Sequence, residues 1–303
     1  MKNIINYIII SIYFLQKGGK KMHKRILAVH DISCIGRCSL TAALPILSAA
    51  GIETSVLPTA VLSTHTGNFE GYTFRDLTDD IEPICNHWKK LNIKFDAIYT
   101  GYLGSVRQIE LVEKLINSFS HDKTLVMVDP VMGDNGKLYS NLTPDFAEGF
   151  RKLSKKADII TPNLTEAALL LDIPYEKSGY TKEQFEDILK ELSKLGPKKI
   201  VLTGVSFTGS RLGCAVYDST DGSVNFVLEE KVEGMFHGTG DVFASSLMAG
   251  LMNELPIIEA VSLAESFTAD AIRRTDKEGG ETRYGVNFEE GLSDFSRNVK
   301  NRI

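Results

Sequence analysis

The chain has 303 residues, 43% of them hydrophobic and 24% charged, a balance that indicates a globular protein with a sizeable core. Its formal net charge of −5 argues against a broad basic surface, so we expect no nucleic-acid partner. The cysteines are Cys34, Cys38, Cys85 and Cys214. They form no Cys-x-x-Cys pair and have no histidine cluster beside them, which excludes the usual zinc sites. Scattered thiols of this kind are typical of reduced proteins, and we expect a cytoplasmic location.

The first 21 residues differ from the rest of the chain. Their apolar run over 4–15 is shorter than the about 20 apolar residues that span a membrane, and no small-residue signal-peptidase site follows it. The segment 17–22 (KGGKKM) is what translation of a purine-rich ribosome-binding sequence before a start codon would give. We therefore predict that Met22 is the true start and that residues 1–21 are an upstream extension. We expect 22–303 to be one domain with no membrane partner.

From residue 24 onward, short β-rich runs alternate with helical segments. The predicted strands are 25–30, 54–62, 97–100, 124–129, 158–161 and 199–203, followed by a hairpin over 213–217 and 223–228. The predicted helices are 39–50, 77–91, 106–119, 145–155, 165–171 and 182–195, and two more, 242–252 and 257–274, close the domain. Alternation with nearly continuous apolar strands favours an α/β fold with three α/β/α layers and a mostly parallel central sheet.

Polar residues follow the predicted strands, where parallel sheets bind ligands. They are Asp31, the segment 64–67, Asp129, the segment 161–163 and the segment 203–204. Because the carboxyl ends of parallel strands meet at one edge of a sheet, we expect these residues to line one cleft.

The run Gly238, Thr239, Gly240 and Asp241 lies between a β-like stretch and a helical segment. Two glycines allow backbone conformations in which free N–H groups converge on an anion at a helix start. A carboxylate just after them can take a proton from a hydroxyl that attacks this anion, which suits phosphoryl transfer. A glycine turn followed by an acidic N-cap fits these residues equally well.

Two further carboxylates suit magnesium. Asp129 precedes Pro130 on a rigid strand-end turn, although an Asp before Pro is also a common turn former. Glu166 follows Asn163 by three residues near a helix start, which favours a capping role when it is taken alone. Magnesium prefers few protein carboxylates together with waters and phosphates, so this pair would form a sparse shell, in part through water.

The chain lacks the P-loop, the Gly-x-Gly-x-x-Gly dinucleotide motif after the first strand, the His-Arg-Asp motif of protein kinases and the Gly-x-Ser-x-Gly elbow. It does resemble the ribokinase-like superfamily over about 24–292, and within it the pyridoxal kinase family. The resemblance is carried by the blocks 63–66 (STHT), 101–105 (GYLGS), 129–133 (DPVMG), 161–166 (TPNLTE) and 238–241 (GTGD).

This resemblance implies ATP-dependent phosphorylation of the 5′-hydroxymethyl group of pyridoxal, pyridoxine or pyridoxamine. Asp241 would be the base, and the N–H groups of 238–240 would hold the transferring phosphoryl group. Asp129 and Glu166 would organise Mg²⁺ and the ATP phosphates. The resemblance also implies a homodimer, and it leaves a monovalent-cation requirement open.

The remaining site residues follow from the same resemblance. Thr161, Asn163, Thr203 and Gly204 would contact the nucleotide. Asp31, Thr66 and His65 would contact the vitamin. His65 could equally be a packed or capping histidine, and we do not assign it a catalytic role. Asp31 stands where familiar members carry Ser, and Thr203 where some carry Lys, which leaves the preferred vitamer open.

Two alternatives remain at this point. A hydroxymethylpyrimidine (phosphate) kinase of thiamine synthesis shares the fold, but Cys often stands at the position of Asp241 in that family. A non-catalytic vitamin-binding protein on the same fold would be expected to lose Asp241 or the glycines, and all of them are present.

Overall fold

The computed structural model describes residues 24–140 and 142–302. The predicted upstream extension 1–21 and the predicted start at Met22 lie outside the described residues, and the single domain over 22–303 stays a prediction. Within the described residues, no helix is both long and apolar enough to cross a membrane.

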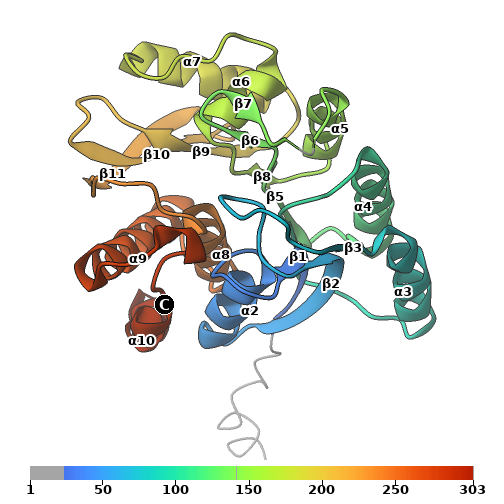
Figure 1. Ribbon diagram of the computed structural model, residues 1–303. Helices are drawn as coiled ribbons and strands as arrows, with labels where there is room; N and C mark the ends of the chain where they lie inside the picture. The colour runs from blue at the N-terminus through green and yellow to red at the C-terminus, as the bar shows by residue number, and fades with distance from the viewer. Residues whose placement is uncertain (1–23, 141, 303) are drawn as a thin grey trace, which may run out of the picture.

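The described part of the chain forms a nine-stranded sheet in the order β11-β10-β9-β8-β5-β4-β1-β2-β3 (Figure 1). The strands are β1 Arg25–Ser33, β2 Glu53–Leu62, β3 Phe74–Asp76, β4 Ala97–Thr100, β5 Leu125–Val128, β8 Ile159–Ile160, β9 Lys199–Val205, β10 Arg211–Asp218 and β11 Ser223–Glu230. Neighbours from β2 to β9 pair in parallel, and the edge strands β3, β10 and β11 pair antiparallel. A separate two-stranded sheet joins β6 Gly133–Asp134 to β7 Lys137–Leu138.

Helices cover both faces of this sheet (Figure 1). One face packs against α3 Thr78–Lys90, α4 Val106–Phe119, α5 Asp145–Ser154, α6 Leu164–Leu171 and α7 Lys182–Ser193. The other packs against α2 Leu40–Ala49, α8 Thr239–Met252, α9 Ile257–Glu278 and α10 Leu292–Arg302. The short helices η1 Thr282–Tyr284 and η2 Glu289–Gly291 precede α10. The predicted three-layer α/β/α fold with a mostly parallel sheet is therefore confirmed.

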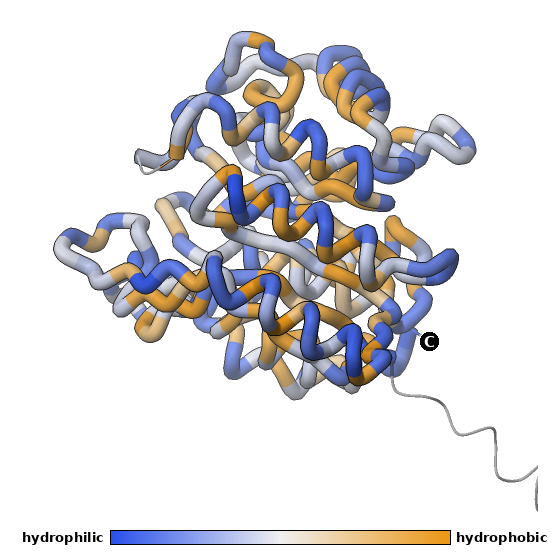
Figure 2. The backbone as a smooth tube through the Cα atoms, turned by 90° about the vertical axis from the view of Figure 1, so that its right-hand side faces the viewer, coloured by the Kyte–Doolittle hydropathy of each residue, from blue (hydrophilic) through white to orange (hydrophobic). Residues whose placement is uncertain are grey.

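The hydrophobic pattern explains this layering. Strand β5 sends Val126 and Val128 into one core and Met127 into the other, so a continuous apolar run is buried on both faces. Surface helices instead alternate hydrophilic and hydrophobic residues, as the mixed colours along them show (Figure 2). In α4, for example, Ile109, Val112 and Ile116 recur at helical spacing and are buried.

Strand β1 lies at the topological switch point of the sheet. The chain runs from β1 to β2 on one side and then returns to β4 on the other side. Connections that leave a strand in opposite directions open a crevice at its carboxyl end, where α/β proteins bind ligands. The carboxyl end of β1 is thereby the place where a ligand is expected.

Several predicted boundaries are wrong. Strand β1 continues to Ser33, so Asp31 lies inside it, because pairing with β2 resumes after a register shift between His30 and Ile32. Helix α8 begins at Thr239, three residues before the predicted start, because Gly238 already acts as its N-cap. Helix α10 follows the two helices that were predicted to close the domain, and β3, β6 and β7 were not predicted. These short strands carry too few residues to show a period.

The packing of α8 generates a stability prediction. Leu247 is fully buried in the core between α8 and the sheet. Leu247→Ala is expected to lower the free energy of unfolding by about 2–5 kcal/mol, because it removes buried methyl groups and leaves a cavity. Leu44→Ala on α2, where the side chain is 40% exposed, should change it by no more than about 0.5–1 kcal/mol. Urea unfolding of both variants checks this, and equal losses would contradict the assigned core.

Candidate active site

Gly238 forms the N-terminal end of α8 in a conformation that only glycine adopts easily. Its φ is 74°, and a Cβ placed on it would lie 2.0 Å from the carbonyl oxygen of Arg37. The loop before α2 therefore packs directly on this turn. No side chain in the described part of the chain caps α8, so the N–H groups of its first turn point toward the space in front of the helix.

Asp241 lies in this first turn and is half-buried. Desolvation, together with a smaller effect of the nearby Asp31 carboxylate, raises the pKa of its carboxyl group to about 7. A hydrogen bond from the backbone N–H of Ser39 acts in the opposite direction, because it stabilises the ionised form. Asp241 is therefore a carboxylate poised to exchange a proton near neutral pH.

Asp31 faces the same space from β1. It is 4% exposed, and Ser33 Oγ donates a 3.1 Å hydrogen bond to its Oδ2. Within the described residues its Oδ1 is buried and has no partner. Burial raises the pKa of this carboxyl group, while hydrogen bonds from Ser39 and Ser33 lower it. An acid with one oxygen left over can bind a polar group of a ligand.

Asp129 and Glu166 form a second pair of buried carboxyl groups. Glu166 Oε1 accepts from the N–H of Met132 at 3.1 Å, and its Oε2 accepts from the N–H of Asn163 at 2.9 Å. Burial raises the pKa of Glu166 to about 8 despite these bonds. Burial, followed by repulsion from Glu166 and Asp241, raises the pKa of Asp129 well above its usual value. Asp129 and Glu166 thus lie close together, and Asp129 is also close enough to Asp241 for the charge of that carboxylate to raise its pKa.

Glu166 also completes a capping box at the start of α6. The Asn163 side chain accepts from the Glu166 N–H at 2.9 Å and donates to the Gly133 carbonyl at 2.9 Å. This confirms the capping interpretation of Glu166, and its carboxylate still borders Asp129. Thr203 lies beside Asn163 in a parallel bridge, and its N–H donates to the Pro162 carbonyl at 2.9 Å.

The remaining two predicted nucleotide residues lie at the same edge of the sheet. Thr161 follows β8 and is 4% exposed, and its hydroxyl oxygen is buried without a hydrogen-bond partner within the described residues. Gly204 lies inside β9, which extends two residues beyond its predicted end, and has φ 78°. A Cβ at this position would meet no atom within 4 Å.

His65 and Thr66 lie in the loop between β2 and β3. His65 Nε2 bonds the carbonyl of Arg283 at 2.5 Å, and its Nδ1 accepts from the N–H of Gly67 at 3.1 Å. Both ring nitrogens are therefore engaged by backbone, and His65 ties this loop to the segment before α10. Thr66 is half-buried beside it. The structure thus favours the packed-histidine alternative for His65.

Sequence reasoning missed two residues of the site. Ser39 lies at the N-cap position of α2 without a side-chain capping bond, close enough to Asp241 and Asp31 to lower the pKa of both carboxyl groups. The signal for it was a Ser before an apolar helix, which marks an N-cap. Burial raises the pKa of Tyr139, after β7, and the nearby charges of Glu166, Asp134, Asp241 and Asp129 also raise it. No sequence pattern marks Tyr139, because the small β6–β7 sheet brings it there.

Comparisons with known proteins agree with this geometry. The family model for phosphomethylpyrimidine kinase matches residues 50–287. A Bacteroides thetaiotaomicron protein provisionally described as a phosphomethylpyrimidine kinase, crystallised with pyridoxal, is 40% identical. The similarity covers 90% of this chain and 96% of that chain with a TM-score of 0.87.

Two pyridoxal kinases are also similar. The structure of the Lactobacillus plantarum enzyme is 30% identical with a TM-score of 0.84, covering 93% of this chain and 99% of that chain. The Sus scrofa enzyme is 28% identical over 254 residues, which are 77% of this chain and 76% of that protein. The expected ribokinase-like architecture is confirmed by these neighbours. The chain therefore belongs to the phosphomethylpyrimidine kinase family that the model defines, and within it to the pyridoxal kinases.

Proposed function

We propose that this protein is an ATP-dependent pyridoxal kinase that phosphorylates the 5′-hydroxymethyl group of pyridoxal, pyridoxine or pyridoxamine. The observation that carries the proposal is the Asp241 carboxylate in the first turn of α8, beside uncapped N–H groups and facing Asp31. The pyridoxal kinases among its relatives, and the pyridoxal in the Bacteroides structure, support the same substrate class.

The geometry supports a simple division of roles. Asp241 accepts the proton of the 5′-hydroxyl as this oxygen attacks the terminal phosphorus of ATP, and the bond from that phosphorus to the leaving oxygen of ADP breaks. The N–H groups of Gly238, Thr239 and Gly240 stabilise the negative charge on the transferring phosphoryl group.

Asp129 and Glu166 fit a magnesium ion held largely through water. Both are buried, both have raised pKa values, and neither has an ion-pair partner in the described part of the chain. No group of three potential metal-ligating residues occurs within the described residues, which suits an ion that keeps its waters and phosphate ligands. When bound, Mg²⁺ would neutralise phosphate charge, and these two carboxylates would hold it.

The other predicted residues divide between the two substrates. Thr161, Thr203 and Gly204 line the nucleotide side, while Asn163 supports it by fixing Gly133 and Glu166. On the vitamin side, the free Oδ1 of Asp31 is suited to the ring hydroxyl or the ring nitrogen. Thr66 would contact the ring from the loop that His65 holds in place.

A phosphomethylpyrimidine kinase activity is the second candidate, because the matching family model carries that description. Asp241 and the pyridoxal-bound relative favour the vitamin B6 substrates over it. A homodimer, a cytoplasmic location and a monovalent-cation requirement stay predictions that rest on the family resemblance.

The substrate assignment is tested by ADP release from Mg-ATP with pyridoxal, pyridoxine, pyridoxamine and hydroxymethylpyrimidine in parallel. We expect turnover with the three vitamers, and we expect Asp241→Asn to fold normally but to lose about 10²–10⁴-fold in kcat, because it removes the base. Turnover only with the pyrimidine would move the protein to thiamine synthesis. Near-normal activity of Asp241→Asn would refute the role of this residue.

The pH dependence follows from the pKa of Asp241. The base must be ionised, so kcat/KM should rise with pH up to about 7 and then level off. Asp31→Asn should move this acid limb to lower pH, because it removes a negative charge that raises the pKa of Asp241. The residual rates of Asp241→Asn, measured over the same pH range, show how much of the pH dependence comes from the titration of ATP itself. If the acid limb of the Asp31→Asn profile lies at the same pH as that of the parent, the effect of the Asp31 charge on the pKa of Asp241 is contradicted.

The two glycines of the anion-binding turn should respond differently to Ala. Gly238→Ala is expected to destabilise the fold, because its φ is positive and its Cβ would meet the Arg37 carbonyl. At Gly240 a Cβ meets no atom within 4 Å, so Gly240→Ala should preserve stability. Its methyl group should still displace the phosphoryl group and lower kcat by roughly 10²-fold. Thermal unfolding and kinetics of both variants separate the effects, and full activity of Gly240→Ala would disprove close phosphate contact.

A further inference from the structure

His237 directly precedes the anion-binding turn 238–241 and contacts the loop between β2 and β3. Asn68 Nδ2 lies 3.0 Å from His237 Nε2. An amide nitrogen of this kind only donates, so His237 Nε2 accepts the hydrogen bond. Burial lowers the pKa of His237, which keeps the ring neutral at pH 7 and leaves Nε2 able to accept. The residue before the anion-binding turn is therefore bonded to the loop that carries Thr66.

Gly67 packs against the same imidazole ring. A Cβ on Gly67 would lie 2.9 Å from both Cε1 and Nδ1 of His237, closer than real Cβ atoms approach. The φ of Gly67 lies outside the left-handed region, so its backbone would accept a side chain without strain. Glycine is therefore needed at this position because of the ring of His237 and not because of the backbone conformation.

Aromatic contacts hold the same loop from its other side. The ring centroid of His65 lies 5.3 Å from that of His237 and 4.9 Å from that of Phe69. The Phe69 ring in turn lies 5.4 Å from the Tyr284 ring, edge to face, and 4.9 Å from the guanidinium carbon of Arg283. Such ring pairs and cation–π contacts stabilise the arrangement. The loop 65–69 is thus held between His237 and the segment 283–284.

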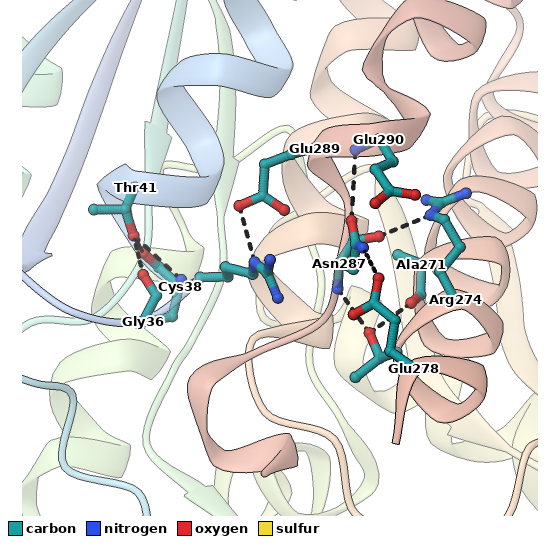
Figure 3. A network of polar contacts seen from close by, with 11 residues as sticks. Gly36, Cys38, Thr41, Ala271, Arg274, Glu278, Asn287, Glu289 and Glu290 are labelled. Atoms are coloured by element: carbon teal, nitrogen blue, oxygen red, sulfur yellow. Dashed lines mark hydrogen bonds and ion pairs between the residues drawn. The ribbon is translucent and has the colours of Figure 1, made fainter. Parts of the chain in front are cut away.

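The segment after Arg283 is itself fixed to α9. His65 Nε2 bonds the Arg283 carbonyl at 2.5 Å. Further along, Asn287 is 3% exposed, and its N–H donates to Thr275 Oγ1 at 2.7 Å. Its carbonyl accepts from Arg274 Nε at 2.9 Å (Figure 3). The loop 65–69 therefore rests on an anchored support, and its contacts with His237 join that support to the anion-binding turn.

We propose that His237 is a positioning residue for the vitamin, because it fastens the loop 65–69 to the anion-binding turn through Gly67 and Asn68. We call these three residues the His237 clasp. The clasp keeps Thr66, on the vitamin side, at a fixed spacing from the N–H groups that receive the phosphoryl group. Ordering the loop before the vitamin binds reduces the entropy that binding must otherwise overcome. The inference rests on the proposed function for the identity of the ligand, and on the contacts of the loop for the clasp itself.

A double-mutant cycle tests the close fit. The methyl group of Gly67→Ala would collide with the His237 ring, so the KM for pyridoxal should rise about tenfold while the KM for ATP changes by no more than about twofold. His237→Ala releases the loop and should raise the KM for pyridoxal by a similar factor. In the double variant the methyl group meets no imidazole at 237, so its KM should be no higher than that of His237→Ala.

Gly280→Ala is the matched control for this cycle. A Cβ on Gly280 would meet no atom within 4 Å, its φ also lies outside the left-handed region, and the residue is exposed. It should leave both KM values and kcat unchanged.

The hydrogen bond of the clasp is tested separately. Asn68 has φ 59°, so Asn68→Gly keeps the backbone conformation and removes only the amide. The KM for pyridoxal should rise by roughly three- to fivefold, less than in His237→Ala, because one hydrogen bond is lost. The amide oxygen of His237→Gln can accept from Asn68, so this variant should recover part of the loss of His237→Ala. A complete lack of recovery would refute the role of the hydrogen bond.

Limited proteolysis by chymotrypsin reports on the clasp without turnover. The loop offers cleavage sites after Phe69 and Tyr72, both half-buried in the structure. Without substrates, cleavage there should be several-fold faster in Gly67→Ala and His237→Ala than in the parent or in Gly280→Ala, because the loop opens more often. A Tm within about 2 °C of the parent shows that the whole fold is kept.

The outcomes separate the clasp from the proposed function. Additive losses in the double variant, or an equal rise in the KM for ATP, would overturn the positioning role of His237. Unchanged cleavage in both single variants would overturn the clasp itself. If the parent protein phosphorylates no vitamer, the proposed function fails, while the cleavage rates still decide whether His237 holds the loop.

Discussion

The desolvation of four carboxyl groups at the carboxyl edge of the sheet is the constraint that shapes this site. Asp31, Asp129 and Glu166 are buried and Asp241 is half-buried. Burial raises all four pKa values, and the charges of Glu166 and Asp241 further raise that of Asp129. None of them belongs to an ion pair in the part of the chain that the structure describes. Buried carboxylates without cations are costly, so the surrounding backbone must offset part of the charge.

Backbone N–H groups supply that compensation, and this explains much of the local architecture. Glu166 accepts from the N–H groups of Met132 and Asn163, and the nearby backbone N–H of Ser39 lowers the pKa of Asp241. These donors come from a turn after β5, a helix cap and the loop before α2. The backbone N–H groups leave part of the negative charge of these carboxyl groups uncompensated. Such a site suits a magnesium nucleotide, because its Mg²⁺ ion would balance this charge together with that of the phosphates.

The segment before α10 links the site to the far end of the chain. His65 is bound by the Arg283 carbonyl, and Arg37 is bound by the Tyr284 carbonyl. The loop after β1 and the loop after β2 are therefore both hydrogen-bonded to neighbouring carbonyl groups of this segment, those of Tyr284 and Arg283. These contacts make the closing segment of the fold a structural part of the candidate site.

Sequence alone determined the layer architecture, because alternating strands and amphipathic helices carry their periods locally. Strand β4 and helix α4 were predicted at their observed bounds. The polar residues at strand ends were also found from sequence, since parallel strands share one carboxyl edge. The capping box of Asn163 and Glu166 was predicted as one alternative for the same reason: its contacts span three residues.

Only the tertiary structure decided how these residues act. The register shift that keeps Asp31 inside β1 depends on β2, and the backbone clamp on Arg37 depends on residues more than 240 positions away. The engaged nitrogens of His65 and the hydrogen bond between Asn68 and His237 likewise depend on segments that are distant in the chain. Local patterns reveal periods and caps, but the direction of a donor and the burial of a charge are set by packing between distant segments.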